Sequence, residues 1–239
     1  MKFTSWLCIT LTTALTVSGT LAAPVKQSVP AKSATPKTQT QVRSTGFFSD
    51  MAISRQSGDI VGTEIFFFVA DKHYALVLVG EGQLQEPQLV EAVVSGNSVQ
   101  FKMQRSGDER LFSGTFSPTG LSGTFGNGDT FKLPRKKPLF FKANSTLSMS
   151  RGSGDAMGLE LVTFLADTEY VLMLEGAGDF LPPRLAKVVD DYGRIKFSTK
   201  NGDGSPLEFR GQRSKTGIQG TFDSPLGNVR LPVKKSFWE

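Results

Sequence analysis

The sequence has little of the residues that build metal centres and disulfide frameworks. It contains one cysteine, Cys8, and one histidine, His73, among 239 residues. One cysteine excludes an internal disulfide framework and a zinc site built from cysteines. One histidine excludes a multi-histidine metal site and disfavours a Ser-His-Asp hydrolase, for which no Gly-x-Ser-x-Gly element is present. We therefore predict no metal, no cofactor and no catalytic residue.

The chain also lacks excess charge outside its N-terminal part. Its formal net charge is +5, with 27 Lys and Arg against 22 Asp and Glu. Five of the basic residues lie in residues 1–45, which contain no acid: Lys2, Lys26, Lys32, Lys37 and Arg43. Residues 46–239 therefore carry 22 basic and 22 acidic residues. This balance argues against nucleic acid as a partner, because single-strand binding needs a positive groove with aromatic platforms.

The N-terminus has the pattern of a secretory signal peptide over residues 1–22. Lys2 precedes an apolar stretch that is too short to span a bilayer, and small residues around Ala22 offer a cleavage site. No second long apolar run follows, so we predict no transmembrane segment and a periplasmic or secreted protein. Residues 23–45, rich in Ala, Pro, Ser, Thr and Lys, predict a disordered basic linker that makes a weak contact with anionic surfaces.

The rest of the chain matches itself when it is shifted by 96 residues. Ser57-Gly58-Asp59 falls on Ser153-Gly154-Asp155, and Ala70-Asp71 falls on Ala166-Asp167. With two single-residue slips, the Leu-Pro pairs at 133–134 and 231–232 also coincide. We predict an internal duplication, with unit 1 over residues 46–137 and unit 2 over 138–239.

The pattern of each unit predicts short strands that are separated by tight turns, and the apolar residues show no helical periodicity. In unit 1 the expected strands are Phe47–Ser54, Thr63–Ala70, Tyr74–Gly80, Leu89–Val94, Val99–Gln104, Arg110–Phe116, Leu121–Phe125 and Thr130–Leu133. This pattern predicts an all-β protein of two tandem antiparallel meanders, each closed into a small barrel or flattened into a sandwich.

Two strands of unit 1 are apolar without alternation, over residues 65–69 and 75–79. Strands of this kind are buried on both faces. One face fills the interior of the unit, and the other needs a cover. Residues 161–166 and 170–174 of unit 2 have the same character. We predict that these runs pack together, within the chain or across a dimer.

The ends of the units resemble a known small domain. Unit 1 ends with FSGTF at Phe112–Phe116, GLSGTF at Gly120–Phe125 and FKLPR at Phe131–Arg135. Unit 2 keeps GIQGTF at Gly217–Phe222 and VRLP at Val229–Pro232. These runs resemble the closing hairpin of a small β-barrel domain that precedes the catalytic domain of some bacterial secreted serine hydrolases and stands alone in other envelope proteins. The resemblance implies fold and extracytoplasmic location, and not catalysis.

Two repeated elements supply the candidate ligand-binding residues. Gly-Asp-x-x-Gly-x-Glu contains Asp59 and Glu64 in unit 1, and Asp155 and Glu160 in unit 2. Paired carboxylates serve cation binding or acid–base chemistry, whereas a turn alone explains the aspartates and places the glutamates at the start of a strand at the barrel rim.

The second element, Ala-Asp-x-x-Tyr, places Tyr74 and Tyr170 after a type I turn, with their hydroxyls at the rim. We expect a non-enzymatic binding or scaffold protein of the cell envelope, with a protein or small ligand at the rim or in the cleft between the units. The alternative is a hydrolase, or a protein that assists one, which uses the repeated carboxylates.

Overall fold

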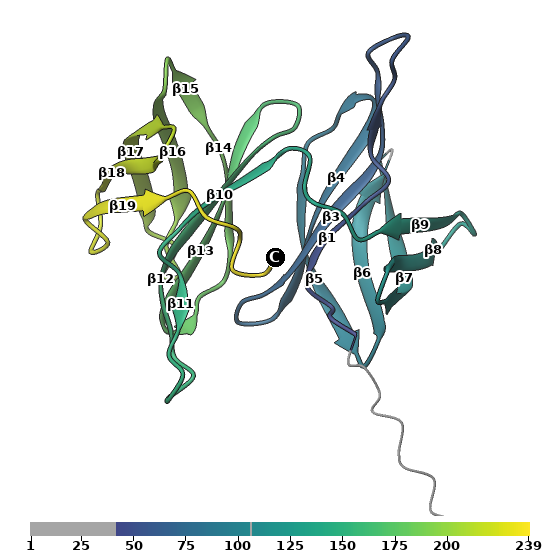
Figure 1. Cartoon of the computed structure of the whole chain (residues 1–239), viewed down its shortest axis with the longest axis horizontal. Helices are drawn as coiled ribbons and strands as arrows, with labels where there is room; N and C mark the ends of the chain where they lie inside the picture. Colours follow the sequence, from purple (N-terminus) through teal and green to yellow (C-terminus); the bar gives the residue numbers. More distant parts are fainter. Residues whose placement is uncertain (1–41, 106) are drawn as a thin grey trace, which may run out of the picture. The chain divides into compact units, whose positions relative to one another are not determined.

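The computed structural model describes residues 42–105 and 107–239, which form antiparallel strands and no helix (Figure 1). The predicted signal peptide, and all of the predicted linker except residues 42–45, lie outside the described residues. The prediction of an all-β fold is confirmed. No helix in the described part of the chain is both long and apolar enough to cross a membrane.

The first half of the described chain forms one nine-stranded sheet in meander order, with β2 paired to β3. Its strands are β1 (Gly46–Ser49), β2 (Ala52–Ile53), β3 (Ile60–Val69), β4 (His73–Leu84), β5 (Gln88–Ser95), β6 (Ser98–Arg105), β7 (Asp108–Ser117), β8 (Gly120–Phe125) and β9 (Thr130–Pro134). A bridge between Phe48 and Arg135 brings the last strand back to the first. The sheet is therefore a nearly closed barrel, as Figure 1 shows for its purple to teal strands.

The second half forms two five-stranded sheets around one core. The first contains β10 (Phe141–Ser145), β11 (Ser148–Met149), β12 (Ala156–Leu165), β13 (Glu169–Phe180) and β14 (Arg184–Lys187). The second contains β15 (Val189–Asp191), β16 (Arg194–Lys200), β17 (Pro206–Ser214), β18 (Gly217–Phe222) and β19 (Asn228–Pro232). A bridge between Asn144 and Val233 links the first and last strands here too.

The expected first strand, Phe47–Ser54, is wrong in one respect, because the structure divides it into β1 and β2 at Asp50. The Oδ1 atom of Asp50 accepts a hydrogen bond from the backbone N–H of Thr63 at 2.7 Å. The preceding residue, Gly62, has φ +107°, and a Cβ atom there would lie 2.9 Å from the Cα of Met51. The backbones approach so closely that only glycine fits, and the strand bends at this point.

The continuous apolar strands are buried on both faces, as predicted. On β3, Ile65 and Phe67 face the interior of the barrel, whereas Phe66 and Phe68 face outward into a separate apolar layer. This shared layer also receives side chains from the second half: Ala143, Leu147, Val162, Phe164, Ala166, Tyr170, Leu172 and Leu174. The prediction that the apolar runs of the two halves pack together is therefore confirmed within one chain.

Contacts between aromatic rings connect the two halves across the shared layer. Phe47 stacks on Phe66 with ring centroids 4.3 Å apart, and Phe47 contacts Phe141 at 5.0 Å. Phe141 in turn stacks on Phe164 at 4.8 Å. Aromatic pairs add to the free energy of burial when their rings meet in offset or tilted geometry. The layer therefore couples the two halves mechanically and energetically.

Candidate functional site

The two repeated glutamates lie in the shared layer, and the expectation that they begin strands at the barrel rim is wrong. Glu64 is the fifth residue of β3 and Glu160 the fifth residue of β12, and both side chains are 0% exposed. They share a strand face with Phe66 and Val162, which belong to the layer. Burial raises the pKa of both carboxyls.

The segment that follows the last strand of the second half covers Glu160. The hydroxyl of Ser236 donates a hydrogen bond to Oε1 at 2.7 Å, and the backbone N–H of Phe237 donates to Oε2 at 2.9 Å. These donors, with the hydroxyl of Ser145, offset part of the rise in pKa that burial causes. Glu160 thus fixes the C-terminal segment against the sheet.

Glu64 is covered by the corresponding segment of the first half, but its carboxylate lacks the hydrogen bonds that Glu160 receives. Neither carboxylate oxygen makes a hydrogen bond of good geometry among the described residues. The hydroxyl of Ser49 and the backbone amides of Leu139 and Phe140 lie beside it and lower its pKa, though by less than burial raises it. The residue at the position of Ser236 is Pro138, which has neither a hydroxyl nor an N–H to donate.

The aspartates of the same element are exposed turn residues. The backbone carbonyl of Asp59 accepts a hydrogen bond from the N–H of Ser54, and Asp155 does the same for Ser150, both at 2.8 Å. Asp59 stands five residues before Glu64, a separation of about 16 Å along an extended strand. The element therefore does not bring its own two carboxylates together, as acid–base hydrolysis would require.

The predicted tyrosines belong to the shared layer through their rings. Tyr74 is 7% exposed, and its hydroxyl donates to Oδ1 of Asp71 at 3.0 Å. Burial, with the neighbouring Asp71, raises the pKa of Tyr74 to about 12. The hydroxyl of Tyr170 lies 3.4 Å from Glu86 of the first half. Both residues close the edge of a packed layer, whereas the sequence led us to expect their hydroxyls at the barrel rim.

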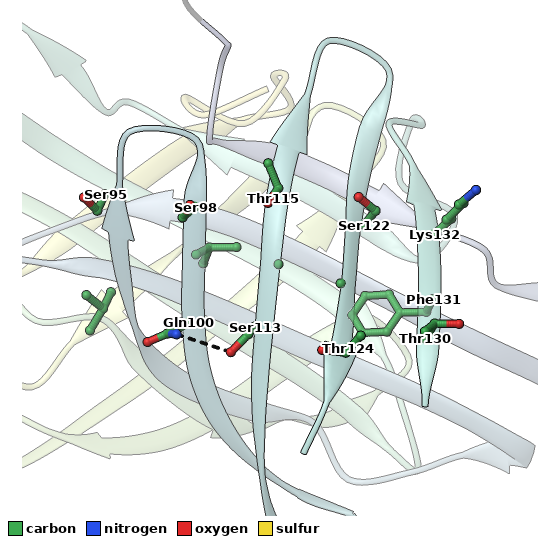
Figure 2. Close-up of a pocket in the computed structure, with 14 residues that line it drawn as sticks. Ser95, Ser98, Gln100, Ser113, Thr115, Ser122, Thr124, Thr130, Phe131 and Lys132 are labelled. Carbon is green, nitrogen blue, oxygen red and sulfur yellow. Dashed lines mark hydrogen bonds between the residues drawn. The ribbon is translucent and has the colours of Figure 1, made fainter. Parts of the chain in front are cut away.

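A wide hollow lies elsewhere, on the outer face of β5 to β9, and sequence reasoning missed it. Its volume is about 880 Å³. Figure 2 shows that hydroxyl and amide side chains from successive strands stand together on this face. They are Ser95, Ser98, Gln100, Ser113, Thr115, Ser122, Thr124 and Thr130, with Lys132 on the last strand. We call this set the hydroxyl face.

The register of the sheet orders the hydroxyl face into two rows. One row runs Ser95, Ser98, Thr115, Ser122 and Lys132, each residue paired with the next across neighbouring strands. The other row runs Val93, Gln100, Ser113, Thr124 and Thr130 in the same way. Neighbouring strands are about 4.8 Å apart, so each row presents polar groups at a regular spacing. Gln100 donates to Ser113 at 3.3 Å (Figure 2).

Glycines behind the hydroxyl face let an aromatic ring fill the barrel. Gly114 and Gly123 are register partners, and their missing side chains would point inward. A Cβ atom on Gly123 would lie 2.6 Å from the ring of Phe112, which therefore packs directly against the backbone of β8. The sequence signal is the repeated Ser-Gly-Thr-Phe, at residues 113–116 and 122–125.

The second half presents a different surface at the same register positions. Its first row contains Arg194, Gln212, Gln219 and Arg230, and its second contains Lys196, Arg210, Thr221 and Asn228. Glu208 pairs with Lys196 at 2.9 Å and with Arg210 at 2.6 Å. Hydrogen bonds and charge from Arg210 and Lys196 lower the pKa of Glu208 to about 2. The two halves therefore share a backbone plan and differ in the chemistry of this face.

Metal-ligand geometry and comparison with known proteins indicate no other site among the described residues. Within the described residues, no group of three or more His, Cys, Asp and Glu side chains is placed to hold a metal ion. Comparison of the chain with protein-family models, with curated proteins and with solved structures gives no match. The geometry of the hydroxyl face is therefore the best indication of what the protein binds.

Proposed function

We propose that this protein is an exported, non-enzymatic binding protein of the cell envelope, and that it binds a neutral polysaccharide on the hydroxyl face. The observation that carries the proposal is the pair of cross-strand rows of Ser, Thr and Gln on β5 to β9. Export follows from the predicted signal peptide over residues 1–22. The resemblance to an extracytoplasmic barrel domain agrees with that location.

The chemistry of the rows favours a ligand that is polar and uncharged. Each hydroxyl can donate one hydrogen bond and accept two, so the face matches a partner that is itself rich in hydroxyls. Lys132 is the one charged side chain among the residues that line the hollow. An anionic polymer would instead be expected to select the arginines and lysines on β16, β17 and β19.

The shape of the face favours a polymer over a small molecule. The rows extend across five strands, and the hollow lies along the sheet surface. Because the strands hold the rows rigidly, binding would cost little conformational entropy in the protein.

Binding can be tested by retention of the purified protein on insoluble cellulose and chitin, with peptidoglycan sacculi, whose peptides carry carboxylates, as a charged comparison. The variant Thr115→Glu/Ser122→Glu places two carboxylates in the middle of the hydroxyl face. The matched control is Gln212→Glu/Gln219→Glu, which makes the same change at the same register positions in the second half.

We expect the wild type and the control to bind cellulose or chitin. The first variant should bind at least about tenfold more weakly, a loss of about 1.4 kcal/mol. Retention on neither cellulose nor chitin, or equal losses in the two variants, would reject the proposal. Circular dichroism and thermal unfolding of both variants serve to check that the fold is kept.

The hydrolase alternative gains no support from this geometry. Glu64 and Glu160 are wholly buried beneath the segments that cover them, and Asp59 and Asp155 lie in exposed turns. A glycosidase needs two carboxyl groups that flank the bond of a bound substrate. We therefore put forward binding alone.

A further inference from the structure

A second hollow of about 320 Å³ opens at the mouth of the first barrel. Thr130 and Phe131 line both this hollow and the hollow on the outer face of β5 to β9, so the two hollows adjoin at β9. We call it the barrel mouth. Its other lining groups come from the bend after β1, from β3 and β4, and from the ends of β6 and β8. Its volume lies at the lower end of the range for small-molecule sites.

The barrel mouth combines charged groups with an aromatic wall. Asp50, Asp129 and Arg105 line it together with the rings of Phe125 and Phe131, whose centroids are 5.1 Å apart. Arg105 is held by Glu81 at 3.3 Å, and its guanidinium lies 5.6 Å from the centroid of Phe125. The hydroxyl face has no such set, because its polar groups are almost all neutral.

Comparison with the second half shows which of these groups the fold itself requires. Thr146 occupies the position of Asp50, and its Oγ1 accepts a hydrogen bond from the N–H of Leu159 at 3.3 Å, just as Asp50 Oδ1 accepts from Thr63. One oxygen is therefore enough for the bend. Asp50 has a second carboxylate oxygen, which the structural hydrogen bond does not use.

The other groups of the barrel mouth also change in the second half. Val229 stands at the register position of Phe131, so the second half lacks that ring. Asn201 stands 96 residues after Arg105 and carries no charge. The carboxylate, the guanidinium and the second ring are thus additions of the first half, where they meet at one opening.

We propose that the barrel mouth is the subsite for one terminal sugar residue of the polysaccharide, and that it selects a sugar without negative charge. The proposal rests on the proposed function of the hydroxyl face. Asp50 and Asp129 would accept hydrogen bonds from sugar hydroxyls, Arg105 would donate to ring or hydroxyl oxygens, and Phe131 would support the apolar face of the ring. Two carboxylates and one guanidinium line the opening, and the neighbouring Glu81 and Arg110 add one charge of each sign, so the net negative charge disfavours a uronate at this position.

The second half supplies variants that should leave the fold intact. Asp50→Thr copies Thr146 and keeps an acceptor for the bend, and Phe131→Val copies Val229. The double variant Asp50→Thr/Phe131→Val removes the surplus carboxylate oxygen and the ring together. As a matched control, Thr146→Asp/Val229→Phe makes the reverse change in the second half. Thermal unfolding checks that both variants fold.

The probes are cellohexaose, chitohexaose and hexagalacturonate, titrated by calorimetry. We expect the wild type to bind a neutral hexasaccharide and not hexagalacturonate. The variant Asp50→Thr/Phe131→Val should lose at least about tenfold in hexasaccharide affinity while its retention on insoluble polysaccharide changes by less than about threefold. The control should match the wild type on hexasaccharides.

Three outcomes would overturn the barrel mouth as a subsite. They are unchanged hexasaccharide affinity in Asp50→Thr/Phe131→Val, no hexasaccharide binding by a wild type that is retained on polysaccharide, and tighter binding of hexagalacturonate than of the neutral probes. In each of them the hydroxyl face can still retain polysaccharide. The proposed function fails separately, if the wild type is retained on neither cellulose nor chitin.

Discussion

The backbone N–H of Phe237 donates a hydrogen bond to the buried carboxylate of Glu160, and no corresponding bond of good geometry is made to Glu64. The two glutamates hold equivalent places on β12 and β3, yet only the carboxylate of Glu160 accepts hydrogen bonds of good geometry. A buried acceptor without a partner costs about 1–3 kcal/mol, and more when it is charged. This difference in hydrogen bonding should make the two sites respond in opposite ways to substitution.

Replacement of Glu64 by glutamine should stabilise the protein at pH 7.5 by about 1 kcal/mol or more. Because burial raises the pKa of Glu64 above its ordinary value of 4.5, the folded state binds more protons than the unfolded state above that pH. The free energy of unfolding therefore falls as the pH rises from about 4.5 through the folded-state pKa. Urea unfolding of Glu64→Gln at pH 5, 7 and 9 should show a weaker fall than the wild type.

Glu160→Gln is the control for this experiment. Ser236 and Phe237 donate to different oxygens of Glu160, and glutamine replaces one of these oxygens with an NH2 group, so this change should be neutral or destabilising at pH 7.5. If Glu64→Gln is less stable than the wild type, or keeps its full pH dependence, the buried charge at Glu64 has been wrongly assigned.

Exchange of the residues that cover the two glutamates should move their pKa values in opposite directions. Pro138→Ser introduces a hydroxyl donor beside Glu64, and we expect it to lower the pKa of that carboxyl. Ser236→Ala removes the donor at 2.7 Å from Glu160, and we expect it to raise the pKa there and to cost about 1–2 kcal/mol. Carbon-detected NMR titration of the two carboxyls measures both shifts. A pKa of Glu64 that does not fall in Pro138→Ser would contradict the equivalence of positions 138 and 236.

Truncation of Phe47 should destabilise both halves of the molecule together. Its side chain is 3% exposed and contacts Phe66 of its own half and Phe141 of the other. Loss of a buried phenylalanine costs about 3–5 kcal/mol. Trp238, which packs against Phe180 of the second half, reports on that half by fluorescence. We expect Phe47→Ala to lower the midpoint of the Trp238 transition, and an unchanged midpoint would show that the halves unfold independently.

Addition of one methyl group at Gly123 should destabilise the first barrel. The new Cβ atom would lie 2.5 Å from the carbonyl oxygen of Ser113 and 2.6 Å from the ring of Phe112, so backbone or ring must move. We expect Gly123→Ala to cost about 1–3 kcal/mol in denaturant unfolding. Gly126→Ala is the control, because the nearest atom to its Cβ would be 3.8 Å away. Equal stability of the two variants would contradict the close packing of Phe112.

The sequence was sufficient to predict most of the strands and the shared layer. The apolar runs at 65–69 and 75–79 lack alternation, and such strands must be covered on both faces. The hairpins are marked by turn residues such as Asn127-Gly128. The same reasoning gave barrel closure, because a long meander otherwise leaves exposed edges.

The burial of Glu64 could not be predicted in the same way. A glutamate in a strand pattern ordinarily faces solvent, and its cover, at residues 138–140, is more than 70 positions away in the chain. The split of the first strand at Asp50 depends on an equally non-local contact with Gly62 and Thr63. Tertiary contacts of this range are invisible to local patterns.

The hydroxyl face was missed for a different reason. Serine and threonine are common on the outer side of a strand, and a single one does not indicate a binding site. Only the register, which pairs Ser98 with Thr115 and Thr115 with Ser122, turns scattered residues into rows. The repeated Ser-Gly-Thr-Phe was visible in the sequence, but its glycines explained it as a hairpin signature.

Arg43 bears on the predicted basic linker. Its guanidinium donates to the carbonyl of Trp238 at 2.6 Å and to the hydroxyl of Thr45 at 3.0 Å. This positive charge is engaged with the folded part of the protein. Attraction of the linker to an anionic surface would therefore depend on Lys26, Lys32 and Lys37, which lie outside the described residues.

The same contact between Arg43 and Trp238 means that the chain enters and leaves its fold at one place. A short peptide can join Glu239 to Val42 without crossing the molecule, and fresh termini can be opened at Tyr192, which is fully exposed in the turn between β15 and β16. Tandem β-proteins with adjacent ends tolerate this kind of circular permutation. The order in which the strands are synthesised is thus separable from the structure that they form.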